Sequence, residues 1–398
     1  MNPHVEGQFD SDQVRALNRA VETRLQDKAD PVDDVQFKSL NDAELFSVDD
    51  SVDDINAAFG SYPVRLERGT HELSGPLQMA DDMQLVGHGI QTYVKPASDF
   101  SGGALIEPPE DKPFNRPHIN NLKLDAADVA SECLHIKSYK GIYENLWMQQ
   151  ATGDNLLYDQ PSGVNGEDNS FISIHSRRAG DYNVRAKAPT GYWGNIQCFA
   201  PGADKNMQFK QFGHLLMGCY TYNKGGVEFE NARYSQVLGC RFNVDPGYQG
   251  IKVFPEKTAE SPPEVMRIVN NIIKGAYTDG VQLDGSSFPL EDVVVADNTF
   301  LFDGDNDPGG YGAHITPRSN TKCRAYISNN TFVEIGDYGG LDDVKYLPSE
   351  GHWNWYNEEA AGTGNTPTAS RYPVGTRVHN TDDGTRWDLE PNDTWYEV

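Results

Sequence analysis

Acidic side chains gather in two short stretches where they could carry out chemistry. In "TDGVQLDG", Asp279 and Asp284 lie on either side of a Val-Gln-Leu core, and in "DGDNDPGG" Asp303, Asp305 and Asp307 alternate with other residues. One protonated and one ionised carboxyl group can hydrolyse a glycosidic bond by inversion when they lie about 6.5–9.5 Å apart. We therefore take Asp279, Asp305 and Asp307 as candidate catalytic residues. The alternative is that both stretches are turns, because Asp and Gly favour turns for local backbone reasons.

The second stretch also has the alternation of a calcium loop. Asp303, Asp305 and Asp307 match the first three ligand positions of an EF-hand loop, but the sixth residue is Pro308 and the twelfth is His314. Calcium needs several oxygen ligands that converge on one ion. A Ca²⁺ site at these aspartates is thus an alternative to an ordinary acidic loop, and the sequence requires no cofactor.

Aromatic side chains offer a third kind of site, because their faces stack on sugar rings. The aromatic residues that we assign to carbohydrate or receptor binding are Trp147, Trp193, Tyr222, Tyr248, Trp353 and Trp355. The alternative is that these rings cover the folded core or line a contact between subunits.

The charge balance excludes several partners. Asp and Glu total 59 against 33 Lys and Arg, for a formal net charge of -26. Like charges repel, so nucleic acid and anionic membranes are not expected partners. The acids are spread along the chain, which favours a protein from a high-salt environment, where screening reduces self-repulsion. No membrane-spanning stretch and no signal peptide are visible.

Short strands recur along the middle of the chain at intervals in the range of about 20–50 residues that marks solenoid repeats. Most of them begin near an Asn or a Cys. The aligned positions are Asn121, Asn145, Asn169, Asn195, Cys219, Cys240, Asn271, Asn298 and Asn330. One coil cannot bury its own inward face, so coils must stack. Cys219 and Cys240 then occupy the same position in adjacent coils. The five cysteines form no metal-binding or disulfide pattern.

The first strands of this region carry a family resemblance. The stretch "LERGTHELSGPLQMADDMQLVGHGIQTYVKP" resembles the opening coils of pectate-lyase-like right-handed β-helices of the viral tail-spike type. The resemblance implies an all-β, right-handed parallel β-helix and a virion surface protein. Pectin-hydrolysing relatives have Asn-Thr-Asp followed by Gly-Asp-Asp on the next coil. Here Tyr277 replaces the Asn, and Asn306 splits the acidic pair, so the match at Asp279, Asp305 and Asp307 is partial.

The two ends differ from the coils. A helix is expected over residues 11–29, with Val14, Leu17, Val21 and Leu25 on one stripe. The last residues, "VGTRVHNTDDGTRWDLEPNDTWYEV", resemble the short C-terminal modules of phage fibres. We expect an attachment segment over residues 1–60, the β-helix over 61–338 and a C-terminal module over 339–398.

These observations predict a tail spike or fibre of a virus with a halophilic host. It is expected to be a homotrimer that contacts other virion proteins and either glycans or a glycoprotein of the host cell surface. A polysaccharide-degrading enzyme on the same scaffold is one alternative, and a purely structural virion component is another.

Overall fold

The computed structural model describes most of the chain from residue 43 onward. The described residues are 43–59, 61, 63–109, 114–160, 168–231, 233–254, 266–284, 290–302, 313–317, 323–334, 351–356, 377–380, 386–389 and 395–397. The compact unit that holds these elements is Glu44–Val398. The expected helix over residues 11–29 lies outside the described residues.

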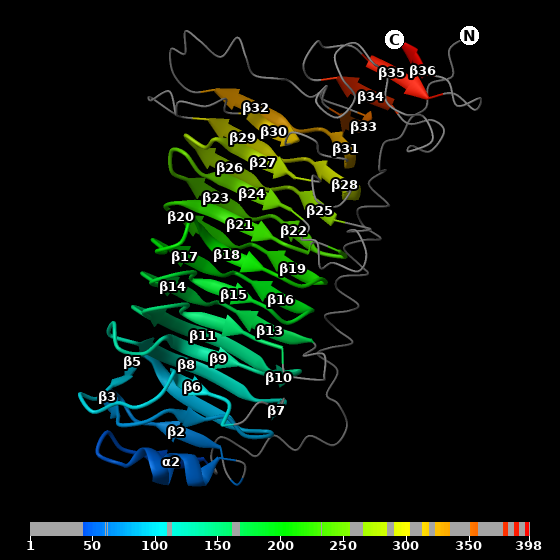
Figure 1. Ribbon diagram of the computed structural model, residues 1–398. Helices are drawn as coiled ribbons and strands as arrows, with labels where there is room; N and C mark the ends of the chain where they lie inside the picture. The colour runs from blue at the N-terminus through cyan, green and yellow to red at the C-terminus, as the bar shows by residue number, and fades with distance from the viewer. Residues whose placement is uncertain are drawn as a thin grey trace. The chain divides into compact units, whose positions relative to one another are not determined.

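Each coil contributes three short strands, so the strands form three rows of parallel neighbours (Figure 1). The first row contains β13 (Asn169–Ile172), β16 (Gly191–Gly194), β19 (His214–Met217), β22 (Gln236–Leu238), β25 (Met266–Val269), β28 (Leu290–Ala296) and β31 (Cys323–Ser328). The second row contains β14 (His175–Arg177), β17 (Gln197–Phe199), β20 (Tyr220–Tyr222), β23 (Arg241–Val244), β26 (Ile272–Gly275), β29 (Thr299–Phe302) and β32 (Thr331–Glu334). The third row contains β4 (Leu77–Gln78), β6 (Ala104–Glu107), β9 (Glu132–Ile136), β12 (Leu156–Tyr158), β15 (Val184–Ala186), β18 (Lys205–Phe209), β21 (Gly225–Phe229), β24 (Gln249–Val253), β27 (Asp279–Leu283) and β30 (Ala313–Pro317).

Longer strands join the first two rows near the N-terminal end. They are β5 (Gln84–Pro96), β8 (His118–Asp125) and β11 (Ile142–Gln149). The first described elements are β1 (Glu44–Phe46), the short helix α2 (Val52–Ala58), β2 (Val64–Leu66) and β3 (Gly69–Leu73), and a small pair joins β7 (Phe114–Asn115) to β10 (Ser138–Tyr139). Ser51 caps α2 by accepting a hydrogen bond from the backbone N–H of Asp54.

Four further strands follow the last coil. They are β33 (Gly351–Tyr356), β34 (Arg377–Asn380), β35 (Arg386–Leu389) and β36 (Trp395–Glu397). Strand β33 pairs antiparallel with β31, and β34, β35 and β36 extend that sheet. The fold class predicted from the sequence, an all-β parallel β-helix, is confirmed by the parallel register of the three rows.

The corner between the first and second rows explains why Asn recurs. One residue of each corner has φ between 50° and 64°, the left-handed region that Asn and Gly adopt most readily. These corner residues are Asn121, Asn145, Ser173, Asn195, Gly218, Gly239, Asn270, Asp297 and Asn329. Three of the positions aligned from the sequence coincide with this corner, and five lie one residue later, inside the coil. Asn169 differs: it begins β13, where its side chain accepts hydrogen bonds from Ser138 and Gly141.

The residue after each corner points inward and forms a column along the solenoid. In the later coils this column bonds from coil to coil. The backbone N–H of Cys219 donates to Sγ of Cys240, and that of Cys240 donates to Oδ1 of Asn271 at 2.8 Å. The side-chain amides of Asn271 and Asn298 donate to the next Asn at 2.9 and 3.0 Å. The expectation that Cys219 and Cys240 share one position in adjacent coils is confirmed, and both are free and buried.

Large aromatic side chains fill the interior of the middle coils. The rings of Phe171 and Trp193 stack with centroids 3.9 Å apart, and Phe209 meets Trp193 edge-on. Both rings of the stacked pair are completely buried. Burial of one such side chain contributes about 1.5–3 kcal/mol, and many buried side chains together are needed to offset the loss of conformational entropy in each coil. Stacking of coils is therefore what makes the strands stable.

Candidate functional site

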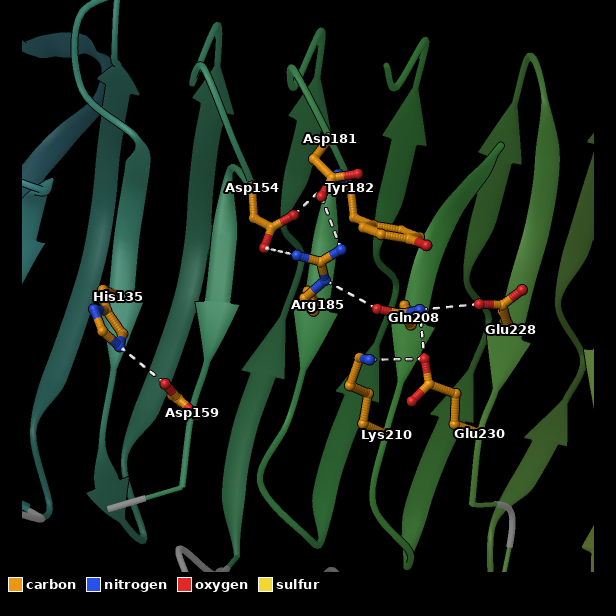
Figure 2. Close-up of polar contacts among 10 residues, drawn as sticks. All are labelled: His135, Asp154, Asp159, Asp181, Tyr182, Arg185, Gln208, Lys210, Glu228 and Glu230. Carbon is orange, nitrogen blue, oxygen red and sulfur yellow. Dashed lines mark hydrogen bonds and ion pairs between the residues drawn. The ribbon is translucent and has the colours of Figure 1, made fainter. Parts of the chain in front are cut away.

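The outward side of the third row carries a connected set of polar side chains. We call the linked set Asp154, Asp181, Arg185, Gln208, Lys210, Glu228, Glu230 and Lys252 the polar ladder. Figure 2 shows its members except Lys252, together with Tyr182 and the separate pair of His135 and Asp159. The register places Arg185 beside Gln208, Gln208 beside Glu228, and Glu228 beside Lys252 on successive coils. Outward residues of parallel strands lie about 4.8 Å apart, so long polar side chains can reach their neighbours.

Arg185 is held by two carboxylates and an amide. Its guanidinium forms ion pairs with Asp154 at 3.2 Å and Asp181 at 2.8 Å. Its Nε donates to Oε1 of Gln208 at 2.9 Å, and the guanidinium carbon lies 4.4 Å from the ring centroid of Tyr182. Burial raises the pKa of Asp154, although the charge of Arg185 acts in the opposite direction.

Gln208 joins this cluster to a pair of carboxylates on the next coil. Because its oxygen accepts from Arg185, its amide nitrogen must donate, and it does so to Glu228 at 2.9 Å and to Glu230 at 2.8 Å. Lys252 forms an ion pair with Glu228 at 3.2 Å, and Lys210 forms one with Glu230 at 2.9 Å. Each acid that Gln208 bonds thus has a cation of its own. The polar ladder is electrostatically satisfied within the protein, as partly buried charges must be.

Asp279, the described member of the predicted catalytic trio, lies on the same outward side. It begins β27, is only 2% exposed, and accepts a hydrogen bond from Gln282 at 2.8 Å. On the neighbouring strand Gln249 accepts from the buried Lys205 at 2.5 Å. Burial lowers the pKa of Lys205 to about 8, and Asp279 is among the charges that act against this shift. Asp303, Asp305 and Asp307 lie outside the described residues, so the catalytic and calcium hypotheses for them stay predictions.

The outward side of the second row has a different chemistry, because it is rich in rings. We call Trp147, His175, Phe199, Tyr220 and Tyr222 the aromatic ladder. The rings of Trp147 and His175 stack with centroids 3.6 Å apart, and those of His175 and Phe199 lie 4.9 Å apart. The ring of Phe199 lies 5.8 Å from that of Tyr220 and 6.3 Å from that of Tyr222. The ladder therefore crosses four successive coils.

Cations lie beside these rings. The guanidinium carbon of Arg177 is 5.4 Å from the ring centroid of Trp147, and that of Arg241 is 5.7 Å from the ring of Tyr220. At the N-terminal end Nζ of Lys123 lies 4.2 Å from the ring of Tyr93. Such pairs add an attraction of about 0.5–1 kcal/mol each at exposed sites.

A hydrogen-bond network supports the N-terminal end of the aromatic ladder. Gln149 accepts from Nε and Nη2 of Arg177 at 2.9 and 2.7 Å, and donates to Asp125. The hydroxyl of Tyr93 also donates to Asp125. Burial, followed by this carboxylate, raises the pKa of Tyr93 to about 12, so the phenol stays protonated. The network fixes Arg177 against the ring of Trp147.

The aromatic ladder is partly exposed to solvent, whereas the charged groups of the polar ladder are paired with one another. Tyr222 is 46% exposed, and Trp147, His175, Phe199 and Tyr220 are partly exposed. Exposed ring surface is what a ligand can stack against. We therefore take the aromatic ladder and its flanking cations as the candidate binding site.

The other predicted binding residues have different positions. Trp193 is wholly buried, so its assignment to ligand binding is wrong; its side chain points inward because it lies two residues before the corner at Asn195. Tyr248 is partly buried beside the third row, and its hydroxyl accepts from Nζ of Lys224 at 3.1 Å. Trp353 and Trp355 lie on β33, where only the backbone is described.

Several members of the site were missed from the sequence, namely His175, Arg177, Phe199 and Arg241. A usable signal exists, because the second and fourth residues after each corner point outward in the second row. Counting from Ser173 selects His175 and Arg177, and counting from Gly218 selects Tyr220 and Tyr222. In most coils the sequence alignment was built on the inward Cys or Asn that lies one residue after the corner. The corner itself was therefore not recognised, and the outward positions could not be counted from it.

No group of three or more His, Cys, Asp or Glu side chains in the described part of the chain could hold a metal ion. Among its described helices, none is long and apolar enough to cross a membrane.

Comparisons with known proteins bear on the fold. No family model matches the sequence, and no curated protein matches it. A protein of Geobacillus virus E2 is similar in structure, with a TM-score of 0.52 and 12% identity over 89% of this chain and 86% of that chain. The catalytic domain of an α-1,3-glucanase, in complex with tetrasaccharides, has a TM-score of 0.51 and 10% identity over 75% of this chain and 67% of that chain. The A-module of a mannuronan C-5 epimerase from Azotobacter vinelandii has a TM-score of 0.48 and 12% identity over 72% of this chain and 94% of that chain.

The class that these observations define is the parallel β-helix. At these identities the likeness shows the fold alone, and the same scaffold serves unrelated functions. The function must therefore be argued from the outward side chains of this chain.

Proposed function

We propose that this protein is a virion tail spike or fibre that attaches to host-surface glycans through the aromatic ladder. The observation that carries the proposal is the run of outward rings from Trp147 to Tyr222, with a hydrogen-bonding cation beside each end. Sugar rings have an apolar face and a rim of hydroxyl groups. Aromatic faces and fixed polar groups match those two features.

The spacing of the coils favours a polymer over a single sugar. Successive outward positions repeat about every 4.8 Å along the solenoid, so a linear glycan that lies along the second row meets similar side chains at each step. Many weak contacts of this kind add up, as in other multivalent recognition. The structural likeness to a viral protein supports the virion as the setting.

The polar ladder favours attachment without cleavage, because its carboxylates are already paired within the protein. Its carboxylates Glu228 and Glu230 are each neutralised by a lysine and by the shared amide of Gln208. A general acid must instead hold its proton near neutral pH, which requires an unpaired or strongly desolvated carboxyl group. The alternative of a polysaccharide-degrading enzyme rests on Asp279, Asp305 and Asp307, and the fold that the α-1,3-glucanase shares supports it only as a scaffold.

Binding to a glycan array in concentrated salt tests the proposal. We expect wild-type protein to bind a defined set of glycans, and Trp147→Ala and Tyr222→Ala to lose about fivefold or more in affinity, since stacking of one ring contributes about 1–3 kcal/mol by the analogy of bases on aromatic side chains. Tyr234→Ala is the matched control, because Tyr234 is 50% exposed and lies off the aromatic ladder. If the wild type binds no glycan, or if the control loses as much affinity, glycan attachment through this ladder is excluded.

The enzyme alternative has its own test. If the spike cleaves its glycan with Asp279, then Asp279→Asn abolishes the release of reducing ends or unsaturated products, and the melting temperature stays close to that of the wild type. Cleavage that persists in Asp279→Asn removes this residue from any mechanism, and the absence of cleavage by the wild type leaves attachment as the function.

A further inference from the structure

The cations beside the aromatic ladder differ from the other cations of this protein in one respect. On the polar ladder Arg185, Lys210 and Lys252 each form an ion pair with a carboxylate. Among the described residues, Arg177 and Arg241 have no carboxylate within ion-pair distance. Arg177 is bonded to the neutral amide of Gln149, and Arg241 to the neutral amide of Asn243 at 3.3 Å.

This lack of pairing is unusual for so acidic a chain. Acids outnumber Lys and Arg by 59 to 33, so a cation at a random surface position would have a carboxylate nearby. After their corners, the outward positions of β8, β11, β14, β17, β20, β23 and β26 instead hold the bases Lys123, Arg177, Arg241 and Lys274 and a single acid, Asp125; Glu144 lies before the corner of β11 and pairs with His118. One face of the solenoid thus reverses the sign of the whole protein.

The single acid does not offset these cations at the surface. Asp125 is 3% exposed, and its oxygens accept from Tyr93, Gln149 and the backbone N–H of Ala127. Its charge is directed into a hydrogen-bond network under the face. The positive charge of Arg241, in contrast, lies on an exposed side chain.

We propose that the glycan bound at the aromatic ladder is anionic, with carboxylate or sulfate groups on its sugars. The inference rests on the proposed function, because it names the class of glycan that the same site takes. A guanidinium binds a carboxylate or a sulfate through two parallel hydrogen bonds, and the ring beside it stacks on the sugar. The pair of Arg177 and Trp147 and the pair of Arg241 and Tyr220 each offer a guanidinium for the anionic group and a ring for the sugar. The two pairs lie two coils or more apart.

High salt makes this recognition local. The net charge of -26 repels a polyanion at a distance, but at 1 M salt the Debye length is about 3 Å. Repulsion from distant carboxylates is then screened, whereas direct contact with an arginine is screened much less. An anionic polymer can therefore approach this face although the protein as a whole is acidic.

The test compares polymers that differ only in charge, in 1 M salt. The pairs are dextran sulfate with dextran, and polygalacturonate with its full methyl ester. We expect wild-type protein to bind at least one anionic member at least tenfold more tightly than its neutral counterpart. The double variant Arg177→Gln with Arg241→Gln should lose that preference, and Arg116→Gln should keep it, because Arg116 is a half-exposed arginine that pairs with Asp82 away from the ladder.

Arg241→Gln alone guards against a folding defect, since the side chain of Arg241 is exposed and, in the described part of the chain, has polar or ring contacts only with Tyr220 and Asn243. It should lower the preference while the melting temperature is unchanged. Equal binding of the neutral and anionic members would overturn the inference and leave glycan attachment standing. Preference that survives in both arginine variants would also overturn it. A third outcome is that the protein binds none of the four polymers but binds neutral glycans on the array. That result would contradict the anionic class of glycan and leave glycan attachment standing.

Discussion

At the scale of single residues, the corner between the first and second rows separates two roles of asparagine. Asn195 occupies the left-handed corner position and is exposed, whereas Asn298 lies one position further along, buried in the inward column. A side chain at the first position is chosen for its backbone conformation. One at the second position is chosen for the hydrogen bonds that it makes to the coils on both sides.

The two roles predict different costs of mutation. In Asn298→Ala the backbone N–H and the side-chain amide of Asn271 both lose their acceptor, and the buried carbonyl of Ile268 loses a donor. We expect the free energy of unfolding to fall by at least about 1–3 kcal/mol, the cost of leaving buried polar groups unpaired. Asn195→Gly is the control and should change it by less than about 0.5 kcal/mol, because Gly adopts positive φ without strain. Urea unfolding measures both, and equal losses would contradict the distinction.

A second prediction concerns a histidine in the core. His214 is completely buried and accepts a hydrogen bond from Nε1 of Trp193 at 3.3 Å. Burial lowers its pKa from 6.5 to about 3. The unfolded chain therefore takes up a proton that the folded chain does not accept, so the free energy of unfolding falls as the pH drops from about 6.5 towards 3.

The slope from one such proton is at most about 1.4 kcal/mol per pH unit. His214→Asn keeps an acceptor near Trp193 but has no titrating group, so its stability should depend less on pH over this range. Thermal unfolding of both proteins between pH 4 and 7 measures the difference. Parallel profiles would show that His214 does not contribute to the acid sensitivity.

At the scale of elements, the polar ladder depends on one uncharged residue. Gln208 is 5% exposed and connects Arg185 with both Glu228 and Glu230. In Gln208→Met the two carboxylates lose their shared donor and face each other without it. We expect a loss of about 1–3 kcal/mol in the free energy of unfolding. Gln236→Met, on the outward side of β22, is the matched control, and a similar loss there would remove the special role of Gln208.

At the scale of the whole molecule, the excess of acids governs the response to salt. With a net charge of -26, self-repulsion weakens the folded state at low ionic strength and is screened in molar salt. We propose a high-salt environment and expect the melting temperature to rise steadily between 0.15 and 3 M KCl. A melting temperature that is flat or falls over this range would contradict the halophilic proposal.

The oligomeric state is predicted at the same scale. The outward positions of the first row include a column without charges or polar side chains, formed on successive coils by Ile172, Gly194, Met217, Leu238 and Val269. We propose the homotrimer, and light scattering in concentrated salt should then give a mass near three times 44.2 kDa. Leu238→Glu should lower that mass if the column lies between subunits. A wild-type monomer would exclude the soluble trimer.

The sequence by itself determined the solenoid, because its signals are local. Each corner needs a residue that tolerates positive φ, and each strand needs alternating apolar residues, so Asn, Gly and Cys recur with the period of the coil. It also determined that Cys219 and Cys240 share one position. These features require no knowledge of which coils touch.

Only the tertiary structure decided which aromatic residues face the solvent. Trp193 and Trp147 look alike in the sequence, yet Trp193 lies two residues before its corner and points inward, whereas Trp147 lies two residues after its corner and points outward. The corner shifts the alternation of side chains by one residue, so the direction depends on a backbone angle that the sequence does not display. The pairing of charges was hidden for a similar reason. Arg185 and Arg177 are equally basic, and only the neighbouring coil determines that one meets carboxylates and the other an amide and a ring.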